Sequence, residues 1–501
     1  MVERSLPLAA LLVLLAGAFA VRALHIDFGL PAHYHPDETN AVKEIEQLDR
    51  GGGLHGYRHP PLQRMLAYVG LLAYHFTTGE SRHVQSDGYR ALRRVSMVAG
   101  TFAVAAVYFL ARPFVGPWPA VLAAALYTVT PLVVVSSKYG VPDTLLACLF
   151  AVGLAVQIGI TKHTATWRYA ACGFVVGLAV GAKYPGALLG ISAVAAHVLA
   201  KRQGVKSTAL SITVFVLGLG TGLWVGFPLL FTEWGDIRAG VAYELEHVYQ
   251  KGHLGLRVSG ADFHYLYYLR AAVLPALGPV ATPAAVAGLV VLAVTRPRQM
   301  AVLLAAAFPY YVAIECAYII PPAPERYVLP LVALYAVAAV AALRAALAGL
   351  RNAQPWIRAA ATCGAAILLL AWPTFRTAQV VSGLVPDSRD TMKTCLLRSL
   401  PAGSVIAAGG VSAYVPPLSG TKLRYRPYVE PQPLTFTGYY LATSFIYQRY
   451  LDFPGHHPQW TRFYRRLFNE GRIICQVSPG NRSYLFNNPS LTLYEIARQF
   501  R

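Results

Sequence analysis

Two adjacent carboxylates, Asp37 and Glu38, follow a His-Tyr-His-Pro segment shortly after the first long apolar run. A carboxylate that is held beside a membrane and partly removed from water can act as a general base toward a hydroxyl or an amine. The same residues also fit a simpler interpretation, in which Asp37 caps a helix that continues to Asp49. His33 and His35, with Asp37, are a third alternative as ligands of a divalent metal, although a His-x-His pair needs further ligands.

Basic side chains follow twenty residues later, where Arg58 and His59 precede two prolines. The prolines and the apolar stretch 62–73 predict a stiff turn into a helix that lies along the membrane surface. Arg58 and His59 would then lie at the interface, within reach of a phosphate group. An interfacial anchor explains the same pattern without any ligand.

Three further basic residues and one acid lie at the ends of later apolar runs. Lys138 and Asp143 flank a Gly-Val-Pro turn, which also fits an ordinary helix entry, and Arg326 precedes another apolar run. Lys183 interrupts apolar sequence, where an ionisable residue is costly and therefore indicates a function. Together with Asp37 these residues suit a reaction in which a hydroxyl attacks an activated sugar and a phosphate leaves. The carboxylate would take the proton, and the cations would offset the charge on the phosphate.

The composition indicates that membrane helices position these residues. Of the 501 residues, 55% are hydrophobic and only 13% are charged, about half the charged fraction of a soluble domain. The net charge of +20 lies largely at the ends of apolar runs, where a positive-inside bias and anionic lipids explain it. No zinc-ligand spacing or nucleic-acid motif accompanies the charge, so we expect no nucleic-acid partner.

Apolar runs long enough to cross a bilayer predict about eleven transmembrane helices. The first is expected to be retained, although Ala18-Phe19-Ala20 resembles a signal-peptidase site. The pair on either side of Pro185 is short and also fits one long broken helix. The expected helices are 6–24, 92–111, 118–136, 143–160, 168–183, 185–200, 208–231, 271–295, 300–320, 328–349 and 357–374.

Loop charges predict the orientation of these helices. Lys and Arg are concentrated in the short loops that would be cytoplasmic if the N-terminus is inside, as the positive-inside rule requires. The long loops 25–91 and 232–270 are then outside, within a membrane domain over residues 1–376. Residues 377–501 have the composition of a soluble α/β domain, also outside, in which Cys395 and Cys475 could form a disulfide.

Within that domain the residue patterns predict short strands and helices. The strands are expected at 404–408, 440–444, 472–477 and 491–496, and the helices at 388–399, 444–451 and 459–468.

An ordered set of short motifs over residues 1–375 resembles the GT-C superfamily of membrane glycosyltransferases. The branch that looks most similar contains the bacterial relatives of protein O-mannosyltransferases and of the enzyme that adds aminoarabinose to lipid A. The matching motifs are His35-Pro36-Asp37-Glu38, His59-Pro60-Pro61-Leu62, Lys138-Tyr139 with Pro142-Asp143, Gly177-Leu178-Ala179 with Lys183-Tyr184-Pro185-Gly186, and Arg326-Tyr327 with Pro330.

The resemblance implies a GT-C fold and transfer, with inversion, from a polyprenyl-phosphate-linked sugar to a hydroxyl of a cell-envelope acceptor. By position, Asp37 would be the base, Glu38 would support the geometry and Asp143 would assist the acceptor. Candidates for the lipid phosphate are Lys183, Arg326, Arg58, His59 and Lys138. The expected location is the bacterial inner membrane, with the active site and the C-terminal domain periplasmic or extracellular. No cofactor is expected to be required, and a divalent metal is left as an alternative.

Two other classes of function stay open on the sequence. A flippase or transporter for lipid-linked sugars usually shows internal repeats and ionisable groups near the bilayer midplane, neither of which this sequence shows. A non-catalytic membrane protein that binds a lipid-linked glycan would share the fold. The absence of GxGxxG, Walker A and Asp-x-Asp motifs argues against a nucleotide-sugar donor.

Overall fold

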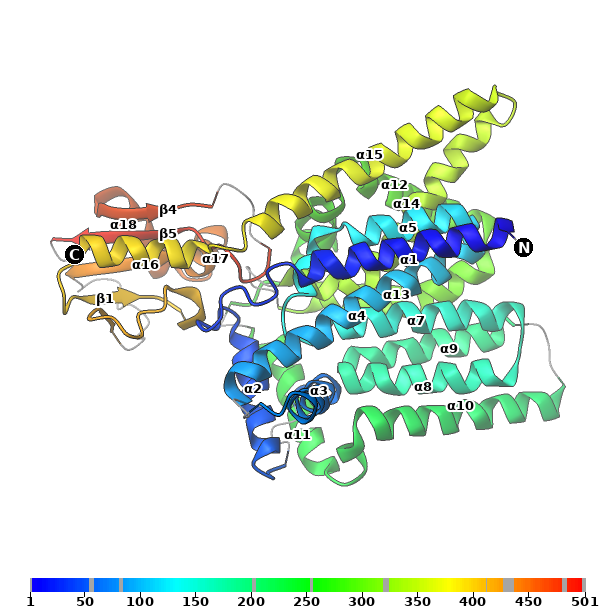
Figure 1. Cartoon of the computed structure of the whole chain (residues 1–501), viewed down its shortest axis with the longest axis horizontal. Helices are drawn as coiled ribbons and strands as arrows, with labels where there is room; N and C mark the ends of the chain where they lie inside the picture. The colour runs from blue at the N-terminus through cyan, green and yellow to red at the C-terminus, as the bar shows by residue number, and fades with distance from the viewer. Residues whose placement is uncertain are drawn as a thin grey trace.

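Long helices run side by side through most of the molecule, with the N-terminus at one end and a small mixed domain at the other (Figure 1). The computed structural model describes residues 2–53, 58–80, 84–200, 204–252, 256–318, 324–410, 412–426, 437–479 and 484–497. Among these residues, eight helical segments are long and apolar enough to cross a membrane. They are centred on α1 (Val2–Ala23), α4 (Val84–Val115), α7 (Asp143–Lys162), α10 (Val205–Gly226), α12 (Leu274–Thr295), α13 (Pro297–Cys316), α14 (Leu329–Leu347) and α15 (Pro355–Ser382).

Shorter helices occupy the other three predicted spans. α8 (Thr166–Ala182) matches its prediction, and α9 (Leu189–Val198) follows a 3-10 turn over Tyr184–Leu188. The span predicted as 118–136 is divided into α5 (Pro117–Thr128) and α6 (Pro131–Ser136). The division falls at Pro131, which lacks the backbone N–H needed to continue α5. The predicted polytopic helical fold is therefore confirmed.

Glycines allow α8 and α10 to pack backbone to backbone. A Cβ added at Gly173 would lie 2.1 Å from the carbonyl oxygen of Phe215, and one at Gly222 would lie 2.2 Å from that of Phe174. Small residues at four-residue spacing permit this close approach between membrane helices. The contact fixes the C-terminal end of α8, which Lys183 follows directly. The glycines on the two helices are Gly173, Gly177, Gly181, Gly218, Gly222 and Gly226.

Three helices cross the end of the bundle nearer the C-terminal domain instead of joining it. They are α2 (Pro36–Asp49), α3 (Leu62–Thr78) and α11 (Trp234–Glu246). In Figure 1, α3 is seen nearly end-on while α4, α7 and α8 run along the picture, so α3 lies across the direction of the membrane helices. This arrangement agrees with the prediction of a helix along the membrane surface after Pro60 and Pro61.

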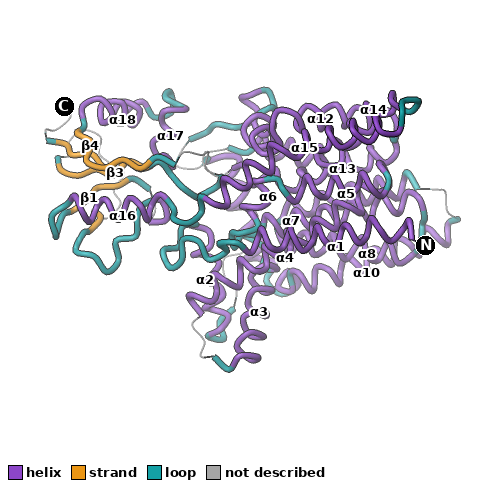
Figure 2. Tube along the Cα trace, turned by 45° about the horizontal axis from the view of Figure 1, so that its top comes forward, coloured by secondary structure: helices purple, strands orange, loops and turns teal. Residues whose placement is uncertain are grey.

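Strands occur only in the C-terminal domain among the described elements, as Figure 2 shows. The sheet order is β2-β1-β3-β5-β4, with β1 parallel to β2 and β3, and β5 antiparallel to β3 and β4. The predicted elements are present; β2, only two residues long, was not predicted. The elements are α16 (Ser388–Ser399), β1 (Val405–Ala408), β2 (Arg424–Tyr425), β3 (Gly438–Thr443), α17 (Ser444–Asp452), α18 (Pro458–Glu470), β4 (Arg472–Val477) and β5 (Leu491–Ile496).

A disulfide joins Cys395 on α16 to Cys475 on β4, across 80 residues of sequence. A cross-link of this span typically stabilises a fold by about 2–4 kcal/mol, largely through the unfolded chain. We expect replacement of both cysteines by alanine to lower the melting temperature of the purified protein. Cys363→Ala, at an exposed free cysteine of α15, is the matched control. Equal melting curves for the two variants would contradict the prediction.

Candidate active site

A narrow pocket of about 80 Å³ lies at the end of the bundle nearer the C-terminal domain, between α2, the start of α3 and the start of α7. It brings together residues from five separate stretches of the chain. Five of the residues predicted from the sequence line it: Asp37, His59, Asp143, Lys183 and Arg326.

Arg326, in the 3-10 turn Pro324–Val328, lies at the centre of this group. Its Nη2 donates to Asp37 Oδ2 at 2.8 Å, and its Nη1 lies 3.2 Å from His35 Nε2. Its Nε lies 3.6 Å from Asp143 Oδ2. One guanidinium therefore connects Asp37 and Asp143, although 289 residues separate it from Asp37.

Lys183 extends the row of charges beyond Asp143. Its Nζ donates to Asp143 Oδ1 at 2.7 Å and lies 4.8 Å from the ring centroid of Tyr327. Acids and bases thus alternate as Asp37, Arg326, Asp143 and Lys183. Two cations are held side by side by a shared carboxylate, a preorganised arrangement that suits an anionic group such as phosphate.

Oδ1 of Asp37 accepts no hydrogen bond from the described residues, and the Asp37 side chain is 43% exposed. Burial would raise its pKa, but the charge of Arg326 outweighs burial, and the pKa lies below its usual range. The carboxylate is therefore ionised, and its Oδ1 is free to accept a hydrogen bond from a hydroxyl group. In the resting protein its basicity is suppressed by Arg326.

His35 caps α2, because its Nδ1 accepts the backbone N–H of Asp37 at 3.1 Å. This corrects the interpretation in which Asp37 is the cap. The ring is fully buried and packs 4.5 Å from Phe486. Burial lowers its pKa to about 4, so the ring is neutral at neutral pH.

We expect the melting temperature of the protein to fall as the pH is lowered from about 6.5 toward 4. In this range an unfolded histidine takes up a proton, whereas buried His35 resists protonation beside Arg326 despite the nearby acids Asp37, Glu38 and Asp143. His35→Asn keeps a capping side chain and removes the titrating ring, so its melting temperature should depend less on pH. A pH dependence in this variant equal to that of the wild-type protein would contradict the assignment.

His33 does not join the pocket residues. Its ring stacks on Tyr89 at 4.1 Å between centroids. Within the described part of the chain, no three His, Cys, Asp or Glu side chains lie together in a way that could hold a metal ion. The arrangement of His33, His35 and Asp37 therefore gives no support to the metal interpretation.

Glu38 is fully buried and lies against Arg93 of α4. Its two oxygens accept from Arg93 Nε at 2.9 Å and Nη2 at 2.8 Å, and Oε1 also accepts the Gly140 N–H at 2.6 Å. Arg93 Nη1 donates to the carbonyls of Ile26 and Phe28. With these partners Glu38 is placed to position Asp37, its neighbour in sequence, and not to contact substrate.

Two of the predicted phosphate ligands lie outside the pocket lining. Lys138 is buried and donates to the carbonyls of Val21, Arg22 and Leu24, at the C-terminal end of α1. These carbonyls satisfy its ammonium group, so Lys138 caps a helix. The guanidinium of Arg58 stacks over the ring of Tyr243 on α11 at 3.8 Å, close to the pocket but not lining it.

The sequence did not single out four polar residues of the pocket wall: Asn40, Glu44, Gln63 and Arg64. Asn40 and Glu44 follow Asp37 at helical spacing on one face of α2, which was a readable signal. Arg64 forms an ion pair with Glu44 and donates to the carbonyl of His59.

The C-terminal domain contacts the segment that leads into α2, beside the pocket. Arg389 stacks over the ring of Tyr34 at 3.6 Å and donates to its carbonyl, and the Tyr34 hydroxyl donates to Asp390. Phe486 covers His35 and stacks with Tyr414 at 5.7 Å. We call Tyr414 and Phe486 the aromatic roof. The sequence offered no signal for the contacts of Tyr34 and His35 with this domain, because they join residues more than 350 positions apart.

Comparison with known proteins places this arrangement in context. The family model described as dolichyl-phosphate-mannose-protein mannosyltransferase matches residues 73–230. A search of curated proteins gives no match. The apo oligosaccharyltransferase of Archaeoglobus fulgidus is similar at 13% identity, over 94% of this chain and 74% of that chain, with a TM-score of 0.54. ArnT from Cupriavidus metallidurans bound to undecaprenyl phosphate is 12% identical over 98% of each chain, with a TM-score of 0.46.

Proposed function

We propose that this chain, a multi-pass membrane protein with the GT-C fold of membrane glycosyltransferases, transfers a sugar from a polyprenyl-phosphate donor to a hydroxyl of a cell-envelope acceptor. The observation that carries the proposal is the row of Asp37, Arg326, Asp143 and Lys183 in one pocket at the outer ends of the helices. The matching family model, whose description names a dolichyl-phosphate-linked mannose, supports the donor class.

In the proposed reaction the donor phosphate lies against Arg326 and Lys183. Both cations offset the charge that grows on the phosphate as the bond to the anomeric carbon breaks. Asp143 holds them together by accepting from Lys183 and lying beside Arg326. Arg326 and Lys183 therefore supply the positive charge that stabilises the leaving phosphate. We propose that no cofactor is required.

Asp37 would accept the proton of the attacking hydroxyl. A bound phosphate adds negative charge beside Arg326, which weakens the hold of Arg326 on Asp37 and raises the pKa of the carboxylate. The base would thus become stronger when the donor is present. Attack on the face opposite the departing phosphate inverts the anomeric carbon.

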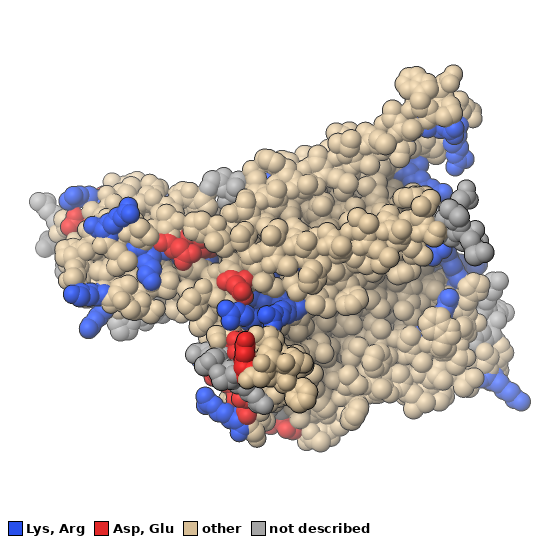
Figure 3. Space-filling view, viewed as in Figure 1, with Lys and Arg blue, Asp and Glu red and all other residues tan. Residues whose placement is uncertain are grey.

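The distribution of charge supports the orientation that we propose. On the face seen in Figure 3, basic side chains gather at the end of the bundle that holds the N-terminus, opposite the C-terminal domain. The positive-inside rule makes that end cytoplasmic. The pocket and the disulfide-bonded domain then face the periplasm or exterior, where disulfides persist. We propose a bacterial inner membrane.

Sugar transfer tests the proposal directly. Purified full-length protein in lipid is incubated with radiolabelled polyprenyl-phosphate hexoses or pentoses and crude envelope acceptor, with and without EDTA. We expect labelled acceptor and free polyprenyl phosphate, in equal yield with EDTA. Movement of the donor across vesicle membranes without transfer would favour a flippase. Donor binding without either activity would favour a non-catalytic glycan-binding protein.

A further inference from the structure

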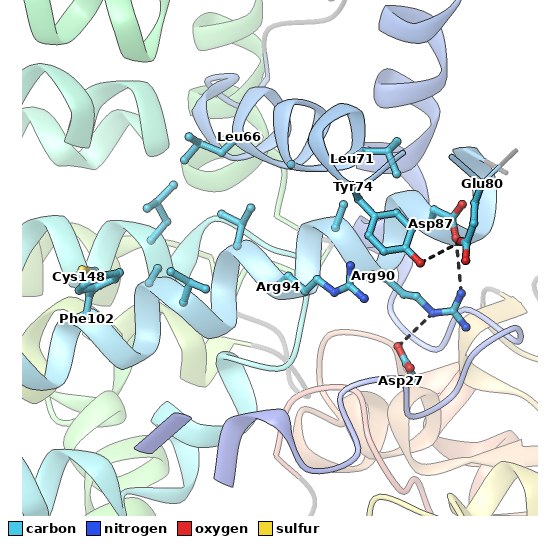
Figure 4. A pocket seen from close by; sticks show the side chains of 16 residues that line it. Asp27, Leu66, Leu71, Tyr74, Glu80, Asp87, Arg90, Arg94, Phe102 and Cys148 are labelled. Atoms are coloured by element: carbon cyan, nitrogen blue, oxygen red, sulfur yellow. Dashed lines mark hydrogen bonds and ion pairs between the residues drawn. The ribbon is translucent and has the colours of Figure 1, made fainter. Parts of the chain in front are cut away.

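A larger cavity of about 680 Å³ lies on the other side of α3, where this helix crosses α4 (Figure 4). Its walls come from α3 and α4, and Leu145 and Cys148 of α7 close its inner end. Figure 4 shows charged side chains at one end and apolar side chains at the other. We call this cavity the α3–α4 groove.

Small residues create the groove. Gly70 on α3 and Ala91 and Ala99 on α4 line it. A Cβ added at Gly70 would meet no atom within 4 Å, so the space beside this glycine is open. A glycine inside an exposed helix costs about 1 kcal/mol relative to alanine, and the vacant space is what this glycine provides here.

The groove opens toward the lipid. Its part of α4 belongs to the membrane-spanning segment Ser86–Val115. Leu66, Val98 and Phe102 line it and are 43%, 42% and 65% exposed. In a bilayer such a surface is covered by hydrocarbon, because no water is available to fill it.

At the charged end of the groove, Arg94 has no carboxylate partner among the described residues. Arg90 lies 3.4 Å from Asp27 and 3.5 Å from Asp87. Arg94, one helical turn further toward the apolar end, is exposed and lies over the ring of Tyr74 at 5.5 Å. Among the described residues no carboxylate lies within 4 Å of its guanidinium.

We propose that the α3–α4 groove binds a membrane phospholipid, with an acyl chain along Leu66, Val98 and Phe102 and the phosphate on Arg94. Anionic headgroups complement a free cation at the membrane surface, and an arginine pairs with phosphate by charge-assisted hydrogen bonds. The inference does not depend on the proposed sugar transfer, because the groove and the small pocket are separate cavities.

A polar contact separates the two cavities. Gln63 Nε2 donates to Ser96 Oγ at 2.9 Å, and Ser96 Oγ donates to the Val141 carbonyl at 3.2 Å. Gln63 belongs to the pocket and Leu66 to the groove, and both lie on the first turns of α3. The lipid would therefore support, from the membrane side, the helix that forms one pocket wall.

Lipid binding to the purified full-length protein tests this inference. Native mass spectrometry compares dioleoyl-phosphatidylglycerol with dioleoylglycerol, which has the same chains and no phosphate. We expect wild type to prefer the phospholipid by about tenfold, as one charge-assisted contact provides. A phosphatidylglycerol with a diazirine in its acyl chain should label α7 near Leu145 and Cys148.

Two variants separate the parts of the inference. Arg94→Gln should remove the preference for phosphate and leave dioleoylglycerol binding unchanged, with Arg112→Gln, exposed at the other end of α4, as its control. Gly70→Leu should place an apolar side chain in the groove, where an added Cβ meets no atom within 4 Å, and abolish the label on α7. Gly220→Leu on α10, where an added Cβ also meets nothing, controls for the added side chain.

Three results would overturn the inference. Equal affinity of the wild-type protein for the two lipids would show that the groove does not recognise the phosphate. Labelling of α7 in Gly70→Leu at the wild-type level would place the lipid elsewhere. If inorganic phosphate displaced the phospholipid and raised the melting temperature as much, the ligand would be a free anion.

Discussion

Asp37→Asn is expected to lower the turnover number for sugar transfer by about 10²–10⁴-fold, the usual contribution of a general base. The amide keeps the shape of the side chain and can still accept from Arg326 through its oxygen. It cannot take a proton from the acceptor hydroxyl. Donor binding should change little, because Arg326 and Lys183 are retained, so the loss should fall on turnover and not on the KM for the donor.

The measurement is initial-rate transfer at saturating donor. Asp236→Asn, at an exposed acid in the first turn of α11, is the matched control and should transfer at the wild-type rate. Both variants should melt at the wild-type temperature. A well-folded Asp37→Asn protein with wild-type turnover would exclude Asp37 as the base and leave the fold assignment untouched.

Glu38→Gln should have the largest effect on stability, a loss of about 3–5 kcal/mol, because it leaves the buried charge of Arg93 without its partner. Both side chains have no solvent exposure, and the pair joins α2 to α4. Burial would raise the pKa of Glu38, but the charge and hydrogen bonds of Arg93 lower it on balance, so the pair is ionised at neutral pH.

Thermal melts in detergent measure this effect. Glu246→Gln, which breaks an exposed pair with Lys251, should cost less than about 1 kcal/mol. The double variant Glu38→Met with Arg93→Met should recover much of the lost stability, because two apolar side chains leave no buried charge. Equal melting temperatures for Glu38→Gln and Glu246→Gln would contradict a structural role for the buried pair.

The sequence predicted the membrane segments well because hydrocarbon imposes a simple requirement. Every backbone group must be paired within a helix, so apolar length alone locates each span. The same requirement does not say where a span breaks, and Pro131 divides a run that composition presents as continuous. The C-terminal elements were also readable, since short strands and helices alternate between turn residues.

The pocket was readable only in part. Asp37, Asp143, Lys183 and Arg326 were expected on one face of the membrane, but the contact between Arg326 and both acids depends on tertiary packing. Lys138 fitted the same pattern as Lys183, because sequence cannot distinguish a lysine that meets a ligand from one that meets the carbonyls ending another helix. Glu38 likewise could not be separated from Asp37 before the position of Arg93 was known.

The aromatic roof lies against the segment that leads into α2 and Asp37. Tyr34 is tied to α16 by Arg389 and Asp390, and His35 lies beneath Phe486. The C-terminal domain cannot swing away without breaking these contacts within three residues of Asp37. The pocket that holds Asp37 is lined by no described residue of the C-terminal domain, so the domain would fix the segment that carries Asp37 from outside the pocket.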